Sequence, residues 1–116
     1  MSESERTIDP EDAKIITLAR SVRARNRAAE GAAVRDLDGR TYTASSVGLA
    51  SLPLTALQAA VVVAASSGAQ GLEAAAVVTE RAPDDVDVTV VADLGGAGTP
   101  VHVAAPDGTP ISTRRA

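Results

Sequence analysis

The chain has no cysteine, no phenylalanine and no tryptophan, and its only tyrosine is Tyr42. Without cysteine, disulfide bonds and thiolate metal sites are excluded. Without aromatic rings, the surface offers almost no platform for stacked bases, which argues against an ordinary single-strand nucleic-acid-binding domain. Hydrophobic residues nevertheless make up 45% of the 116 residues. The core must therefore consist of Ala, Val, Leu and Ile, whose small side chains let helices pack closely on a sheet.

Long apolar segments are also missing. The longest unbroken apolar run, Ala59–Ala65, is far too short to cross a bilayer. The residues after the first methionine, Ser2–Glu5, are polar and acidic, which is not typical of a signal peptide. We therefore expect a cytoplasmic protein without a membrane segment.

The formal net charge is −4, so no overall field attracts polyanions. Basic residues are nevertheless concentrated near the N-terminus, where eight of the eleven lie in the first forty positions. The spacing of Arg20, Arg23 and Arg27 predicts three guanidinium groups on one helical face. Such a face is solvated, pairs with acids of another subunit, or binds phosphates of RNA or a nucleotide.

We predict a disordered tail at residues 1–8 and a single domain at residues 9–116. Asp9 and Pro10 are typical of a helix start, and this first helix is expected to run to about Arg27. Its apolar residues recur at helical spacing and predict one buried stripe, formed by Ile15, Leu18, Ala19 and Val22.

The rest of the chain alternates between strand and helix patterns. Strands are predicted at residues 32–35 and 40–44, joined by the turn Asp36–Gly39, then at 72–79, as a parallel strand covered on both faces, and at 100–104. A second helix is predicted from Ser51 to Ser67, and because it is apolar on all sides we expect it to be buried on most of them. Residues 86–94 fit either a strand or a helix, and residues 111–116 either a short edge strand or a free end. These patterns favour one layered α/β domain.

Three stretches carry a family resemblance: Gly31–Val34, Asp38–Arg40 and Leu54–Ala60. They resemble the small zinc-dependent cytidine deaminases, and the resemblance spans about Pro10 to Gly108. It implies a three-layer α/β fold with a mixed sheet of about five strands and helices on both faces. It also implies a helix over residues 86–94, ended by Gly95 and Gly96.

The residues that carry the family's chemistry are replaced in this chain. In the family, the central helix opens with Cys-Ala-Glu or His-Ala-Glu, which supplies a zinc ligand and the proton-shuttling carboxylate. The matching residues here are Thr55, Ala56 and Leu57. The family's Pro-Cys-x-x-Cys turn corresponds to the region Pro83–Val88. We therefore predict no catalytic residue, with Thr55 and Leu57 as degenerate positions.

The acids of that region, Asp84, Asp85 and Asp87, suit Mg²⁺ or Ca²⁺ better than zinc. We interpret them as a solvated, acidic helix start and predict neither a metal nor another cofactor.

The substrate side of the family's pocket is changed as well. The family's ribose-binding Asn-x-Glu-Asn stretch corresponds to Ser46–Leu49, and Ala28 stands where the family has Phe. What is left of the pocket is expected at four positions, Ser46, Gly48, Thr55 and Ala56. Since the ligands, the shuttle and the sugar contacts are lost together, we predict a pseudoenzyme rather than an enzyme.

Three functions follow from these observations. The first is a non-catalytic protein that acts through oligomerisation, as the homodimer or homotetramer that the family implies, or through an unidentified protein partner. The second is a deaminase-related hydrolase with residual or altered nucleoside activity. The third is an RNA- or nucleotide-binding module that uses Arg20, Arg23 and Arg27. The only histidine, His102, lies on a predicted strand and is interpreted as an ordinary strand residue beside solvent or a neighbour.

Overall fold

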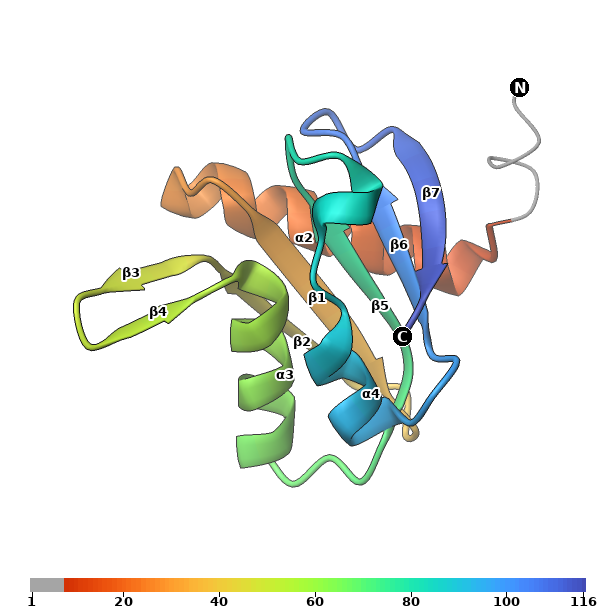
Figure 1. Cartoon of the computed structure of the whole chain (residues 1–116). Coiled ribbons are helices and arrows are strands. Elements are labelled where there is room, and N and C mark those ends of the chain that lie inside the picture. Colours follow the sequence, from red (N-terminus) through yellow and green to blue (C-terminus); the bar gives the residue numbers. More distant parts are fainter. Residues whose placement is uncertain (1–7) are drawn as a thin grey trace.

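The computed structural model describes residues 8–116 and shows a five-stranded sheet with one helix on one face and two on the other (Figure 1). The helices are α2 (Pro10–Asn26), α3 (Ala56–Ser66) and α4 (Thr89–Gly95). The sheet contains β1 (Gly31–Asp36), β2 (Thr41–Ser45), β5 (Leu72–Val78), β6 (Pro100–Ala104) and β7 (Pro110–Arg115). A separate hairpin is formed by β3 (Val47–Leu49) and β4 (Leu52–Leu54). Of the tail predicted for residues 1–8, only Ile8 lies within the described residues, and it packs half buried against the core.

The strands lie in the order β2-β1-β5-β6-β7. β1 is antiparallel to β2 and to β5, β5 is parallel to β6, and β6 is antiparallel to β7. The predicted three-layer α/β fold with a mixed sheet of about five strands is therefore confirmed. The strand predicted as parallel is parallel to one neighbour only, because β1 enters the sheet from the opposite direction.

The two faces of the sheet carry different side chains because residues along a strand alternate between faces. The face under α3 and α4 is lined by larger residues such as Val34, Val77 and Val103. The face under α2 is mostly alanine, at Ala33, Ala74, Ala76 and Ala104. The small side chains on that face let α2 lie close to the sheet.

The first helix was predicted correctly in type and extent. Asp9 caps its start, with Oδ1 accepting a hydrogen bond from Glu11 N at 2.7 Å, and Pro10 occupies the first turn. The helix ends at Asn26, and Arg27 follows in the left-handed conformation with φ of 51°. Arg27 therefore does not continue the helical face of Arg20 and Arg23, as the spacing predicted.

The second helix begins five residues later than predicted. Residues 52–54, including Pro53, form β4, which pairs with β3 in a hairpin that projects beside α3 (Figure 1). α3 then begins after Thr55, which forms a capping box with Gln58. Thr55 Oγ1 accepts from Gln58 N at 3.1 Å, and Gln58 Oε1 accepts from Thr55 N at 2.9 Å. This reciprocal pair satisfies two backbone donors that a helix start leaves open, and so fixes where the helix begins.

α3 is also less buried than its composition predicts. Its inner side packs against the sheet, but Val62 is 50% exposed and Val63 is exposed as well. The prediction that most sides of this helix are buried is therefore wrong for the described structure, because the sheet, α4 and β4 contact its inner side and leave Val62 and Val63 uncovered. Among the helices of residues 8–116, none is both long and apolar enough to span a membrane.

The segment predicted as a helix over residues 86–94 is helical only from Thr89 onward. A 3₁₀ turn covers Pro83–Asp85, and α4 begins only at Thr89. Val86 is buried between the two elements, and Asp87 Oδ1 accepts from Thr89 N at 2.9 Å. The helix ends as predicted at the two glycines, with Gly96 as its cap residue. The last strand pattern forms β7, which is the edge of the sheet.

A polar network ties α2 to the alanine-rich face. Asp12 on α2 accepts a hydrogen bond from Arg35 Nη2 at 2.8 Å, and its other oxygen lies 2.8 Å from His102 Nε2. On the far side of the buried ring, His102 Nδ1 lies 2.9 Å from Thr113 Oγ1. Burial alone raises the pKa of Asp12, but the hydrogen bonds of Arg35 and His102, together with their charges, outweigh it and hold the pKa below its usual value.

This network predicts acid-sensitive stability. Because the folded-state pKa of Asp12 is lowered, its contribution is present above the unfolded-state pKa of about 3.9 and is lost as the pH falls through the folded-state value. We expect Asp12→Asn to reduce the unfolding free energy by about 1–3 kcal/mol at about pH 7 and by much less at about pH 2. Urea unfolding at both pH values measures this, with Asp38→Asn in the exposed turn as the control. An equal loss at both pH values would contradict the assignment.

The capping box predicts a second stability effect. Thr55→Ala removes the acceptor for Gln58 N and is expected to lower the unfolding free energy by about 1 kcal/mol, whereas Thr55→Ser keeps the hydroxyl and most of the stability. Chemical denaturation of the two variants measures the difference. If Thr55→Ser loses as much as Thr55→Ala, the methyl group rather than the cap is what stabilises this position.

Candidate functional site

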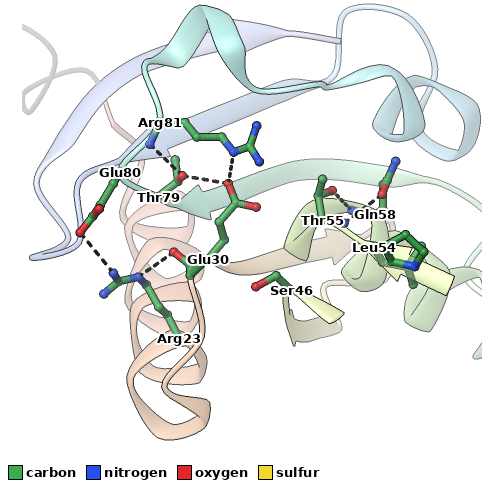
Figure 2. A pocket seen from close by; sticks show the side chains of 11 residues that line it. Arg23, Glu30, Ser46, Leu54, Thr55, Gln58, Thr79, Glu80 and Arg81 are labelled. Atoms are coloured by element: carbon green, nitrogen blue, oxygen red, sulfur yellow. Dashed lines mark hydrogen bonds and ion pairs between the residues drawn. The ribbon is translucent and has the colours of Figure 1, made fainter. Parts of the chain in front are cut away.

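A pocket with a volume of about 410 Å³ lies beside the start of α3. The last turns of α2 contribute Arg23, the residue before β1 contributes Glu30, and the chain after β5 contributes Thr79–Arg81. The opposite wall consists of Ser46, the end of β4 at Pro53 and Leu54, and the helix start at Thr55 and Gln58. The site is thus built by segments from four parts of the chain (Figure 2).

Glu30 is the most buried charged group of the pocket, with a side chain that is 9% exposed. Its Oε2 accepts a hydrogen bond from Thr79 Oγ1 at 2.8 Å and lies 3.2 Å from Arg81 Nε. Thr79 Oγ1 in turn accepts from Arg81 N at 3.0 Å. Two residues, Thr79 and Arg81, therefore hold one oxygen of this carboxylate in a fixed position (Figure 2).

A second ion pair lies at the edge of the pocket. Arg23 Nε donates to the Ala29 carbonyl at 3.1 Å, and Arg23 Nη2 lies 3.8 Å from Glu80 Oε1 (Figure 2). The Glu80 side chain is 81% exposed, so this pair is loose and contributes little to stability. Arg23 is held mainly by the backbone carbonyl.

A smaller cavity of about 50 Å³ adjoins this pocket. It is lined by Thr55 and Leu57 from the helix start, by Asp85 and Asp87, and by the Glu30–Arg81 pair. The structure therefore brings the helix start and the acidic segment together, as the resemblance implies. Sequence reasoning missed Glu30 and Arg81, because neither stands in a recognisable motif and they become neighbours only through the register of β1 and β5.

The four positions predicted as the remnant of the pocket lie in different surroundings. Ser46 and Thr55 line the main pocket. Gly48 is instead an exposed residue of β3, and Ala56 is fully buried in the core. Leu57 is 1% exposed and packs among the core residues under α3.

The predicted arginine face does not form as one surface. Arg20 is exposed beside the turn at Gly108, where its Cδ is close to the glycine backbone. Arg23 lines the pocket, and Arg27 lies beyond the helix in the left-handed conformation. The three arginine side chains therefore lie at three different places on the molecule.

The side chains at the positions of the family's zinc ligands do not fit the zinc ion that the resemblance implies. Within residues 8–116, no three side chains of His, Cys, Asp or Glu come together in a way that could hold a metal ion. Thr55 is engaged as a helix cap, and Leu57 has no donor atom. The exposed Asp87 accepts hydrogen bonds from Thr89, which lower the pKa of its carboxyl group.

The comparisons with known proteins agree with the fold described above. The cytidine deaminase of Mycobacterium tuberculosis is 28% identical, with a match that covers 92% of this chain and 91% of that one at a TM-score of 0.67. The cytidine deaminase of Burkholderia pseudomallei is 22% identical, with 100% and 92% covered and a TM-score of 0.71. No curated protein sequence matches the chain. A family model described as cytidine deaminase-like matches residues 8–108, and the chain therefore belongs to the cytidine deaminase-like family.

Proposed function

We propose that this chain is a non-catalytic member of the cytidine deaminase-like family that acts through self-association or through binding another protein. The observation that carries the proposal is Leu57. At the position where the resemblance places the proton-shuttling glutamate, the chain has an apolar side chain that is 1% exposed and belongs to the core. A leucine cannot carry a proton between water and a base.

The neighbouring groups support the same conclusion. The Thr55 hydroxyl is engaged at the head of α3, where it caps the helix. The one carboxylate that lines both cavities, Glu30, is already paired with Thr79 and Arg81. One oxygen of this carboxylate is thus occupied by two donors of the chain itself.

The self-association part of the proposal is supported by exposed apolar residues on one side of the molecule. Leu49 and Leu52 lie on the projecting hairpin, and Val62 and Val63 lie on the outer side of α3. Hairpin and helix stand next to each other at the β2 side of the sheet (Figure 1). Apolar residues gathered in this way are typical of surfaces that are covered in an assembly.

The non-catalytic assignment predicts the result of a deaminase assay. Incubated with cytidine, the protein is expected to release uridine at less than about 10⁻³ turnovers per second, against about 10 per second for a typical enzyme. Adding zinc or a chelator is expected to change nothing. The cytidine deaminase of M. tuberculosis, assayed in parallel, shows that the conditions detect turnover. Uridine formation that a chelator abolishes would overturn the proposal in favour of a deaminase-related hydrolase.

The self-association part predicts a dimer or tetramer in light scattering at about tens of micromolar. Val62→Glu places a charge in the proposed contact and is expected to yield monomers at that concentration. Ile111→Glu is the matched control, because Ile111 is a β-branched residue of the same exposure, 49% against 50%, on the opposite edge strand β7. A wild-type monomer at this concentration, or equal loss of assembly in both variants, would contradict this contact.

A further inference from the structure

The main pocket contains an open hydrogen-bond acceptor near its base. Glu30 Oε2 is engaged by Thr79 and Arg81, but no group in residues 8–116 donates a hydrogen bond to the other oxygen, Oε1. That atom is not sealed from solvent, since the only fully buried and unpartnered side-chain atom of the described residues is Arg35 Nη1. Figure 2 shows the free oxygen on the side of Thr55, which lines the pocket together with Glu30. An ionised acceptor in this position selects a ligand with an N–H donor, most strongly an ammonium group.

The edge of the pocket presents the opposite charge. Arg81 uses Nε for Glu30, its side chain is 58% exposed, and its two terminal nitrogens have no hydrogen-bond partner within the described residues. Apart from the Ala29 carbonyl, which Nε engages, the partner of Arg23 is the exposed Glu80, which lies 3.8 Å from Nη2. Two guanidinium groups at the entrance select a carboxylate or another oxyanion, which can replace the exposed Glu80 as the partner of Arg23.

The formal charges of the pocket cancel, since Glu30 and Glu80 oppose Arg23 and Arg81. A ligand with a net charge disturbs this balance, whereas a zwitterion places each of its charges against an existing counter-charge. We propose that this pocket binds a small zwitterionic amino acid, with the ammonium group on Glu30 Oε1 and the carboxylate at Arg23 and Arg81. The inference goes beyond the proposed function and does not depend on whether the chain turns over cytidine.

The opposite wall is suited to such a ligand. Ser46 and Gln58 line it, and Gln58 uses Oε1 for the helix cap, which leaves its amide NH₂ group available as a donor. The side chain of Leu54 adds an apolar contact. A volume of about 410 Å³ accommodates a molecule of this size together with water.

The test is a titration of ¹⁵N-labelled wild-type protein, followed by the amide shifts of Glu30, Ser46, Gln58 and Arg81. The probes are glycine, β-alanine and 4-aminobutyrate, which carry both charges at increasing separation. Ethylammonium and propionate are the two halves of β-alanine, and cytidine is the nucleoside probe. With at least one zwitterion, the changes in these amide shifts are expected to reach saturation with a Kd of about 1 mM. Ethylammonium and propionate are each expected to bind at least about tenfold more weakly.

Matched variants locate the site. Arg23→Gln is expected to weaken binding of the zwitterion about tenfold, whereas Arg25→Gln, in the same helix end but outside the pocket, leaves it unchanged. Glu30→Gln is expected to abolish the preference for an ammonium group. Should Glu30→Gln fail to fold, the Arg23 and Arg25 pair still decides the result.

Three outcomes would overturn the inference. The first is that no zwitterion shifts these amides up to about 50 mM. The second is that ethylammonium or propionate alone binds as well as β-alanine. The third is that cytidine binds more tightly than every zwitterion, which identifies a nucleoside pocket; the separate turnover assay then decides whether that nucleoside is also a substrate.

Discussion

The close approach of α2 to the start of β1 is the constraint on which the site depends. A Cβ at Gly31 would overlap the carbonyl oxygen of Ala19 and lie 2.8 Å from Cβ of Arg23, so only glycine fits between helix and strand. The alanines of the same sheet face allow this contact along the helix. Because the last turns of α2 are fixed over the beginning of β1, Arg23 and Glu30 border the same pocket although they come from different elements.

The hairpin of β3 and β4 connects this pocket to the exposed apolar surface. Its base contributes Pro53 and Leu54 to the pocket wall, while Leu49 and Leu52 near its tip are exposed. A protein that covers the tip therefore also restricts the hairpin that forms one wall of the pocket. The proposed ligand and the proposed assembly contact would therefore act on the same element, and any coupling between them would be reciprocal by thermodynamic linkage.

Local signals predicted most of the fold, and long-range contacts account for what they missed. Asp9 and Pro10 fixed the first helix, and the Asp36–Gly39 turn fixed the first hairpin, because both act within a few residues. The sequence predicts the start of α3 too early, because Ser51, Leu52 and Pro53 also form a typical helix start, whereas the capping box of Thr55 and Gln58 sets the actual one. The exposure of Val62 could not be predicted, since it depends on which elements cover the helix. The partners of Glu30 lie 49 or more positions away and follow from strand register rather than from any motif.

The burial of Glu30 indicates that the pocket has a role in binding besides its role in the fold. A carboxylate taken out of water loses hydration, and its pairing with Thr79 and Arg81 compensates at only one of its two oxygens. An apolar side chain at the same position would avoid that loss beside Leu57 and Val77, which line the adjoining cavity. The family's own chemistry does not explain the residue either, since the positions that carry that chemistry, Thr55 and Leu57, are engaged in capping and in the core. A half-satisfied, nearly buried charge beside an open volume is explained most directly by a ligand that supplies the missing donor.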